Sequence, residues 1–403
     1  MLQCYPVSGK QAVSLNGSRC LDLSFNDEQR MLAEAGAGFL AQQYTSAQRG
    51  ISIGTGFDDG VWQRFAELGW LGMIVPEEHG GLGLGAVETG IVCEMMGRAL
   101  VVEPYVEMAI LAPSLISRLA SPEQKKRWLP QIAEGKLRVT AALAEPGSRI
   151  GSDQLATLAT RTEDGWRLKG RKHLVFGAES ADLLLIVVGV KSEEAASLRV
   201  FAVPVPDQRI GITPWQTVDQ RRSAMLDLDD LLLTEDALVG EDVDARFATD
   251  ASIDAALVAM SWEAVGCIEV LLQQTIEYTK TRQQFGRPLS SNQVLRHRMV
   301  EMKLQLETTR GAALHAAMLD GSDAVARGRA ASGAKAKAGE AARFVAEQAV
   351  QLHGGNGVTD ELEIGAYYKR LMALRLLYGG PEHHLERHAR LSAALGAERR
   401  LRP

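Results

Sequence analysis

The chain has 403 residues, of which 46% are hydrophobic and 23% charged, a composition typical of a soluble globular protein with room for two or three domains. Its formal net charge of −6 argues against nucleic-acid binding, which needs a broadly basic surface, so an anionic ligand is expected only in a local basic pocket. The cysteines show neither metal-ligand nor CxxC spacing, and they predict reduced thiols in a cytoplasmic protein. They stand at positions 4, 20, 93 and 267.

The first third of the chain is expected to be helical after a short tail. Residues 1–21 have neither the basic start nor the apolar segment of a signal peptide, and we expect a flexible tail there. Over residues 22–137 the sequence predicts helices, with Asn26 or Ser24 as the cap of the first and Ser121 as the cap of a later one. The glycines of PEEHGGLGLG do not match the GxGxxG dinucleotide fingerprint, and they indicate a loop.

A different pattern begins near Arg138. Short β-branched runs, broken by Gly, Pro and Asp, follow one another roughly every ten residues as far as Gly240. Two of these runs are LRVFAVP and AMLDLDDLLL. Their alternation and spacing predict a small β-sandwich or β-barrel over residues 138–246.

Residues 247–403 are predicted to be helical again and are rich in alanine. The most apolar window, Ile253–Leu272, contains three acidic residues, which favours a buried helix over a membrane span. The order of helices, sheet and helices predicts an α+β protein with no membrane segment. The long amphipathic segments are 250–283, 292–320 and 322–352, and the glycines of GGNG at 354–357 end the last of them.

Two short motifs in this last region have the features of a phosphate site. Arg282–Gly286 (RQQFG) follows the first long helix, where a guanidinium offers two parallel hydrogen bonds to a phosphate and the glycine allows a close backbone approach. Gln351–Gly357 (QLHGGNG) ends the third helix with three glycines, whose backbone amides can approach a ligand. Each motif alone is also typical of an ordinary helix end. Together in one helical domain they predict a site for a phosphate-containing cofactor.

The longer stretches YTKTRQQFGRPLSSNQ and QAVQLHGGNGVTDELEIGAYYKRL resemble acyl-CoA dehydrogenases, as do PEEHGGLGLG and AEPGSRIGSD. The resemblance covers about residues 22–395 and is strongest to two-subunit members, through the small subunit of pimeloyl-CoA dehydrogenase. It implies an N-terminal helical domain, a middle β-barrel and a C-terminal four-helix bundle, with FAD as the cofactor. It also implies an acyl-CoA substrate, a carboxylate that removes the α proton while the β hydrogen leaves as hydride, and an electron-transfer flavoprotein as the electron acceptor.

The resemblance implies particular site residues, and we call residues 282–286 and 351–357 the ADP clamp. The residues expected at the ADP and pyrophosphate of FAD, which in family tetramers belongs to the neighbouring subunit, are Arg282, Gln284, Phe285, Gln293, Gln351, Gly354, Gly355 and Gly380. Those expected near the flavin ring are Glu145, Ser152, His173 and Val175. Those expected at the CoA ester are Ser152, Asp254, Gly379 and Arg390.

On the flavin-ring side the sequence departs from the family pattern. The threonine of the family's TEPG is Ala144 here, and the threonine that bonds the flavin is Val175, so two hydroxyl groups are missing. The tryptophan that covers the ring is His173, and the loop before Ser152 is longer by two residues near Arg149. Backbone amides would still hold the ring, so these changes are expected to weaken flavin binding without abolishing it.

The catalytic base is the sharper departure. The glutamate that most of the family uses aligns with Tyr378, a poor base at neutral pH because the ordinary pKa of tyrosine is about 10. The position that a minority uses is Ala256, and Leu257 stands where an arginine that contacts CoA is common. Glu263 lies on the same helical face as Ala256 and is a candidate for a displaced base, although a buried, paired structural glutamate is the favoured interpretation.

One metal-compatible spacing occurs near the C-terminus. His384 and His388 stand at i and i+4, which places both imidazole rings on one helical face. No third ligand accompanies them in the sequence, so we expect no metal and interpret the segment as an ordinary helix start near the cofactor.

The intact residues are those that a family member lends to a neighbour's FAD, and the altered ones serve its own flavin ring and proton abstraction. This division predicts a heteromeric tetramer, α2β2, in which an unlike partner supplies the glutamate and the flavin-ring pocket. Three alternatives stay open: a self-sufficient homotetramer with Glu263 as the base, a non-catalytic assembly subunit, and a flavin oxidase or hydroxylase on the same fold.

Overall fold

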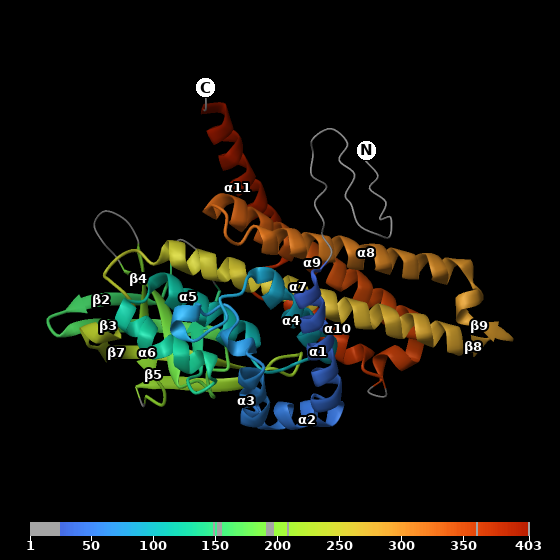
Figure 1. Cartoon of the computed structure of the whole chain (residues 1–403), viewed down its shortest axis with the longest axis horizontal. Coiled ribbons are helices and arrows are strands. Elements are labelled where there is room, and N and C mark those ends of the chain that lie inside the picture. Colours follow the sequence, from blue (N-terminus) through green and yellow to red (C-terminus); the bar gives the residue numbers. More distant parts are fainter. Residues whose placement is uncertain are drawn as a thin grey trace.

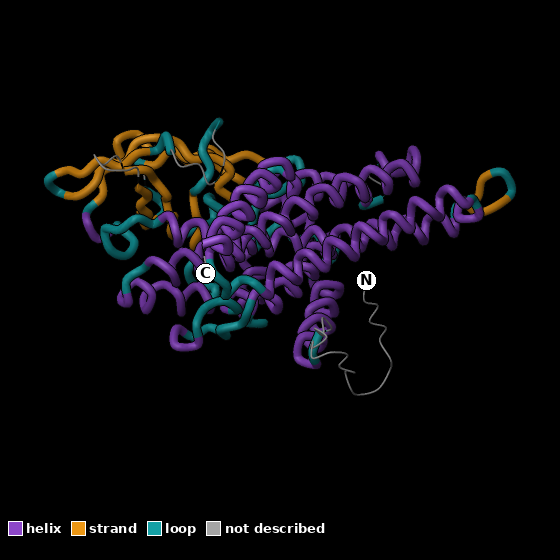
Figure 2. Tube along the Cα trace, turned by 90° about the horizontal axis from the view of Figure 1, so that it is seen from above, coloured by secondary structure: helices purple, strands orange, loops and turns teal. Residues whose placement is uncertain are grey.

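The fold consists of helices, a curled sheet and a bundle of long helices, in the order that the sequence predicts (Figure 1). In Figure 1 the sheet lies at one end of the molecule, and the long helices extend from it to the other end. Figure 2, seen from above, shows the same division between orange strands and purple helices. The computed structural model describes residues 25–147, 150, 155–190, 197–207, 209–359 and 362–401, with side chains as far as residue 394.

The N-terminal helices begin at caps that the sequence predicts. Asn26 accepts the backbone N–H of Gln29 at 2.8 Å while the Gln29 side chain accepts the N–H of Asn26, and Ser121 forms the same reciprocal box with Gln124. These helices are α1 (Asp27–Gln43), α2 (Ser46–Thr55), α3 (Asp59–Glu67), α4 (Ala86–Ala99), α5 (Ala112–Leu119) and α6 (Pro122–Ala133). The short turns between them are η1 (Trp70–Gly72), η2 (Glu77–His79) and the π-helical η3 (Val106–Leu111).

Within the described residues, seven strands form one mixed sheet that is strongly curled. β4 pairs with β5, with β1 at its start and with β2 at its end. From β2 the sheet continues through β3 and β7 to β6. The pairing of β3 with β7 shifts register after Leu168 and again after Lys172, and such bulges increase the local twist of a sheet. The strands are β1 (Val139–Ala142), β2 (Leu158–Thr162), β3 (Gly165–Phe176), β4 (Leu183–Val190), β5 (Ser197–Pro204), β6 (Ile210–Gln216) and β7 (Arg222–Leu233), with η4 (Glu235–Ala237) after them.

The C-terminal bundle is organised around α7 (Arg246–Thr281) and α9 (Ala324–His353). α7 is long and apolar enough to cross a membrane, but 83% of its most apolar window is buried inside the protein, as its acidic residues predict. α9 packs against α7, α8, α10 and α11. The other elements are the hairpin β8 (Gln283–Gln284) and β9 (Arg287–Pro288), η5 (Leu289–Ser291), α8 (Gln293–Met318), η6 (Gly354–Val358), α10 (Ile364–Leu376) and α11 (Pro381–Leu401).

A close crossing of α4 and α7 joins the N-terminal helices to the bundle. A Cβ atom on Gly97 would lie 2.1 Å from the carbonyl oxygen of Glu263, and one on Gly266 would lie 2.0 Å from that of Glu94. Only glycine allows two backbones to approach so closely. The thiol of Cys267 donates to the carbonyl of Gly97 at 3.2 Å in the same crossing. The two regions therefore share one continuous core.

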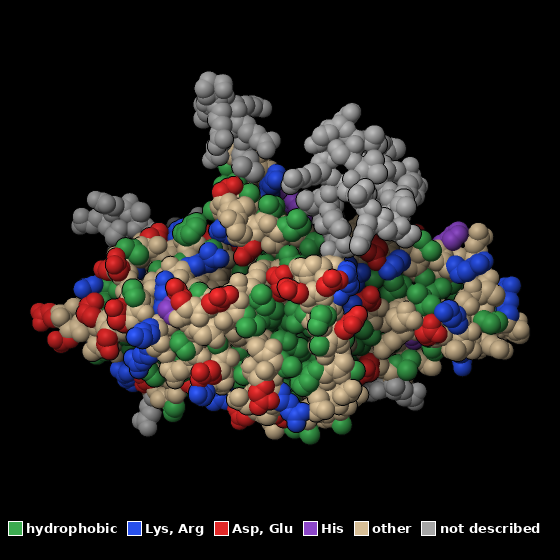
Figure 3. All heavy atoms as spheres, viewed as in Figure 1, with side chains coloured by type: hydrophobic (Ala, Val, Ile, Leu, Met, Phe, Trp, Pro, Cys, Tyr) green, Lys and Arg blue, Asp and Glu red, His purple; other side chains and the backbone are tan. Residues whose placement is uncertain are grey.

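Charged side chains of both signs are interspersed over the face of the molecule in Figure 3, and hydrophobic ones gather near its middle. Among the described residues on that face no continuous basic stripe is visible of the kind that follows a nucleic-acid backbone. On this face an anionic ligand therefore needs a local site.

Candidate functional site

A cavity of ≈ 380 Å³ lies between α7, the start of α9, and α11 with the loop before it. It brings together three residues that the sequence analysis places at the substrate or the base position: Asp254, Tyr378 and Arg390. Apolar residues such as Ile253 and Leu257 share its wall with several arginines. Both the volume and the mixed lining are typical of small-molecule sites.

Two arginines that the sequence analysis missed hold Asp254 in this cavity. Arg387 Nη1 donates to Asp254 Oδ1 at 2.6 Å, and Arg327 Nε donates to Asp254 Oδ2 at 3.4 Å. Arg327 also lies over the ring of Phe247, 5.5 Å from its centroid. The carboxylate of Asp254 is thus neutralised. The guanidinium group of Arg390, which also lines the cavity, suits an anionic ligand. Arg387 stands about one helical turn before Arg390, and that spacing was the available signal in the sequence.

Tyr378 occupies the base position in a loop that is held from both sides. His384 Nε2 donates to the carbonyl of Tyr378 at 3.1 Å, and Lys335 Nζ donates to the carbonyl of Gly379 at 3.1 Å. Tyr378 has a left-handed φ of 57° and is only 5% exposed. Burial, assisted by the charge of Glu107, raises the pKa of Tyr378, so its hydroxyl stays protonated at neutral pH. The side chain at this position therefore offers no base.

The histidines and glycines beside Tyr378 shape the same loop. Burial and the charge of Lys335 lower the pKa of His384 to about 3, so the ring is neutral and Nδ1 is an acceptor. Gly379, expected at the substrate, has a φ of 111°, and a Cβ there would lie 2.6 Å from the ring of His383. Gly380, expected at the cofactor, follows it and lies in this loop, not in the ADP clamp. In the described part of the chain no group of three His, Cys, Asp or Glu residues is placed to hold a metal ion.

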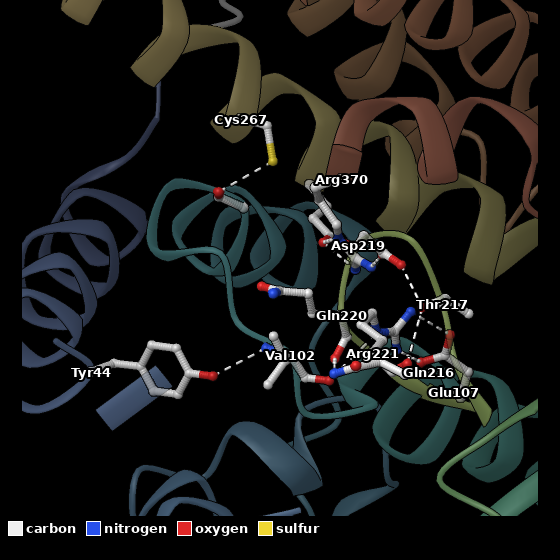
Figure 4. Close-up of polar contacts among 12 residues, drawn as sticks. Tyr44, Val102, Glu107, Gln216, Thr217, Asp219, Gln220, Arg221, Cys267 and Arg370 are labelled. Atoms are coloured by element: carbon white, nitrogen blue, oxygen red, sulfur yellow. Dashed lines mark hydrogen bonds and ion pairs between the residues drawn. The ribbon is translucent and has the colours of Figure 1, made fainter. Parts of the chain in front are cut away.

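Glu263, the candidate for a displaced base, is engaged in a buried ion-pair network and does not line the cavity. Arg370 Nε donates to Glu263 Oε1 at 2.6 Å. Arg370 Nη1 donates to Asp219 Oδ2 at 2.5 Å, and Figure 4 shows these two side chains facing each other. Burial alone would lower the pKa of Arg370, but the two carboxylates outweigh it and raise the pKa. Ala256, the other base position of the family, is fully buried. These contacts favour a structural role for Glu263.

On the flavin-ring side the carboxylate of Glu145 is used inside the protein. It accepts the backbone N–H groups of Ala156 at 2.6 Å and Thr157 at 3.0 Å, and the ammonium group of Lys172 at 2.7 Å. The side chain therefore ties Ala156 and Thr157 to β3, and its carboxylate is engaged inside the protein. Ser152 lies outside the described residues.

The other two residues of this side differ in what they offer. Val175 is buried in the sheet core and has no polar side-chain atom. His173 is half-buried, and its Nδ1 is a buried nitrogen with no hydrogen-bond partner in the described part of the chain. Such an orphaned polar atom fits a contact to a ligand. The flavin-ring side thus retains one unsatisfied side-chain group among its described predicted residues.

Glu145→Gln is expected to lower the free energy of unfolding by about 2 kcal/mol, because Lys172 loses its charged partner in the interior. Burial lowers the pKa of Lys172 to about 8 even though Glu145 raises it, so the loss of Glu145 makes the charge of Lys172 still less favourable. Urea denaturation of the variant and the wild type measures the difference. Glu134→Gln, at an exposed pair with Lys136, is the control, and an equal effect of both changes would contradict the prediction.

The ADP clamp lies at the end of the bundle far from the sheet, where the hairpin of β8 and β9 projects (Figures 1 and 2). Arg282 follows the last residue of α7, and Phe285 at the tip of the hairpin is 100% exposed. The rings of Tyr278 and His353 stack with their centroids 4.4 Å apart, which brings the two segments of the clamp together. The remaining clamp-side residues are also exposed, and they are Gln284, Gln293, Gln351, Gly354 and Gly355.

The clamp fits the phosphate-bearing half of a dinucleotide better than the sheet side fits a flavin ring. A Cβ atom built on Gly286, Gly354 or Gly355 would meet nothing within 4 Å, so the backbone is open to a ligand there. Gly286 and Gly354 also have left-handed φ values of 78° and 61°. The exposed guanidinium of Arg282 beside this open backbone suits a pyrophosphate. When bound, FAD would supply the hydride acceptor.

Two models of one family match this chain. The description "Acyl-CoA dehydrogenase, N-terminal domain" applies to residues 26–136, and "Acyl-CoA dehydrogenase, C-terminal domain" applies to residues 248–392. The chain belongs to the acyl-CoA dehydrogenase family, whose members are FAD-dependent oxidoreductases that act on CH–CH bonds. Acyl-CoA dehydrogenases bind an acyl-CoA and use an electron-transfer flavoprotein.

Proteins similar to this chain include a curated relative and two solved structures of the family. Acyl-CoA dehydrogenase FadE12 of Mycobacterium tuberculosis is 33% identical over 317 residues, which are 76% of this chain and 80% of the relative. The ChsE4-ChsE5 complex from Mycobacterium tuberculosis has a chain that is 25% identical with a TM-score of 0.83, covering 93% of this chain and 99% of that one. A variant of the Tcur3481-Tcur3483 steroid ACAD is 25% identical with a TM-score of 0.82, covering 92% and 99%.

Proposed function

We propose that this chain is one subunit of a heteromeric FAD-dependent acyl-CoA dehydrogenase, in which an unlike partner supplies the catalytic glutamate and the flavin-ring pocket. The observation that carries the proposal is the contrast between two regions. The clamp around Arg282 is intact and exposed, so that it can hold the ADP part of a cofactor seated on another chain. The position of the family's base holds the buried Tyr378.

Proton abstraction next to a thioester needs a base whose pKa lies near the working pH. The pKa of Tyr378 lies further from that range than the ordinary value of tyrosine, because burial raises it. Ala256 offers only a methyl group, and Glu263 is occupied by Arg370. The base of the α,β-desaturation is therefore assigned to the partner.

The surface around the clamp supports an unlike protein neighbour as well as a nucleotide. Phe285 is 100% exposed, and Val358 and Val294 are 75% and 60% exposed beside the two halves of the clamp. Exposed apolar side chains around an open glycine backbone suit a site that a second chain completes. The partner would thereby bury these side chains while its FAD enters the clamp.

The finer assignment is an α2β2 enzyme in which this chain corresponds to the small subunit of pimeloyl-CoA dehydrogenase. The proteins named ChsE4-ChsE5 and Tcur3481-Tcur3483 support a two-subunit form, since each name joins two proteins and a chain of each shares this fold. The proposed electron acceptor is an electron-transfer flavoprotein. The cavity around Asp254 and Arg387 is the proposed place of the CoA ester on this chain.

Arg282→Ala is expected to raise the FAD dissociation constant of the assembled enzyme about 10- to 100-fold, because a hydrogen bond to a charged group contributes about 1.5–3 kcal/mol. The chain is co-expressed with the unlike acyl-CoA dehydrogenase of its gene neighbourhood, and FAD per complex and FAD affinity are measured. Lys280→Ala is the matched control, since Lys280 is an exposed cation two residues away that pairs with Glu277.

Three outcomes would overturn the proposal. One FAD per chain with full turnover in the lone protein would make it a self-sufficient enzyme. Unchanged flavin content in Arg282→Ala would reduce the chain to an assembly subunit. Fast reaction of the reduced flavin with oxygen in the complex would indicate an oxidase or hydroxylase.

A further inference from the structure

The two halves of the ADP clamp are connected through one pair of aromatic rings. Tyr278 and His353 are 75 residues apart in the chain, and their rings stack at a centroid distance of 4.4 Å and an interplanar angle of 28°. Tyr278 lies one helical turn before Arg282, and its backbone carbonyl accepts the backbone N–H of Arg282 at 2.8 Å. His353 is the last residue of α9 and directly precedes Gly354. The stack thus lies where both halves of the ADP clamp leave their helices.

Hydrogen bonds fix the orientation of both rings. Tyr278 Oη donates to the carbonyl of His353 at 3.3 Å, and His353 Nδ1 donates to the carbonyl of Ala349 at 2.8 Å. Burial lowers the pKa of His353, so the stacked ring is uncharged at neutral pH. A Cβ on Gly357 would lie 3.1 Å from the Cβ of His353, because the turn after α9 folds back over this residue. The glycine turn therefore packs directly on the backbone end of His353.

We propose that Tyr278 and His353 are positioning residues for FAD, and that their stack sets the spacing between Arg282 and the glycine turn that starts at Gly354. The inference rests on the proposed function, since it takes the clamp as the site of the ADP part. Arg282 in one half and Gly354 and Gly355 in the other are exposed, and each half lies at the end of its own helix. A displacement of about 1 Å between the two halves would prevent both from contacting one pyrophosphate at hydrogen-bond distance.

Tyr278→Ala is expected to raise the FAD dissociation constant of the assembled enzyme about tenfold, because the ring stack and the hydrogen bond to His353 are lost together. Tyr278→Phe keeps the stack and should raise the constant by no more than about threefold. FAD titration of the flavin-free complex, followed by flavin fluorescence, measures both. Phe57→Ala removes a partly buried ring that contacts Trp62 in the N-terminal helices, and should leave FAD affinity unchanged even where it lowers the melting temperature.

A double-mutant cycle separates positioning from general stabilisation. When Arg282 is already alanine, adding Tyr278→Ala should change FAD affinity much less than it does in the wild type, because the guanidinium to be positioned is gone. An equal tenfold loss in both backgrounds would overturn the inference. If Arg282→Ala weakens FAD binding and Tyr278→Ala does not, the positioning role fails while the proposed function stands. If neither substitution weakens FAD binding, the proposed function fails as well.

Discussion

Arg370→Met is expected to lower the free energy of unfolding by about 4 kcal/mol, because removal of one partner of a buried ion pair leaves the other charge uncompensated. Here two carboxylates lose their partner, since Arg370 donates to Asp219 at 2.5 Å and to Glu263 at 2.6 Å. Methionine keeps most of the apolar length of the side chain. Urea denaturation at neutral pH measures the loss. Lys369→Met, at the exposed neighbouring position, is the control and should change stability by less than about 0.5 kcal/mol.

The loss of unfolding free energy caused by Arg370→Met is expected to depend on pH, and the sign of this dependence follows from the pKa of Asp219. In the wild type, burial alone would raise the pKa of Asp219, but Arg370 and Arg221 outweigh it and lower the pKa below its usual value. A lowered folded-state pKa contributes stability that is present above the unfolded pKa and is lost as the pH falls through the folded value. Without Arg370 burial dominates, so the folded variant binds protons at a higher pH than its unfolded chain.

The variant should therefore be most destabilised at and above about pH 7 and should approach the wild type as the pH falls toward about 5. Parallel denaturation curves over this range test the sign. A deficit that stays constant with pH would show that lost packing, and not the uncompensated carboxylates, dominates the effect.

The chain purified without a partner is expected to support reduction of added FAD by an acyl-CoA at less than about one thousandth of the rate of the complex, because a positioned base contributes on the order of 10²–10⁴-fold to such a step. Burial raises the pKa of Tyr378, so it does not replace the missing carboxylate. Anaerobic stopped-flow bleaching of the flavin, with FAD added in excess to both samples, measures the two rates. Excess FAD ensures that weak cofactor binding is not mistaken for slow chemistry.

Two variants in the complex show whether this chain takes part in the proton transfer. Tyr378→Phe should leave the rate within about threefold, since it removes only a hydroxyl that is not expected to ionise. Glu263→Gln should lower stability through its contact with Arg370 and leave the rate of the folded fraction unchanged. A complete loss of turnover in either variant, with FAD still bound, would place the base on this chain.

Local features of the fold were predictable from the sequence because they depend on neighbouring residues. The caps at Asn26 and Ser121 and the burial of α7 are of this kind. Contacts between distant residues were not, since Glu263 meets Arg370 107 residues later, and Asp254 meets arginines 73 and 133 residues later. Sequence pattern indicates that such side chains are buried on a helical face, and only the tertiary structure shows which charge balances them.

The site residues divide in the same way. The exposed clamp around Arg282 could be proposed from a motif, because its function depends on a short segment with a fixed order of residues. The role of Glu145 could not, because its carboxylate bonds to Lys172, which lies 27 residues later on β3. The ring pair of Tyr278 and His353 also escaped the sequence analysis, since each residue is unremarkable on its own helix. The individual assignments to FAD and CoA stay predictions.

The glycine-mediated contact of α4 with α7 also has a consequence for biosynthesis. Every residue of α4 from Thr89 to Gly97 is buried, so this part of the helix has no face in contact with water. Its partner α7 begins at Arg246, and the contact of Cys267 with Gly97 spans 170 residues. During synthesis on the ribosome, the surface of α4 that packs on α7 therefore stays uncovered until α7 has been made. Uncovered apolar surface favours aggregation and chaperone binding. The N-terminal helices are thus synthesised first, but their packing is complete only after α7 has been synthesised.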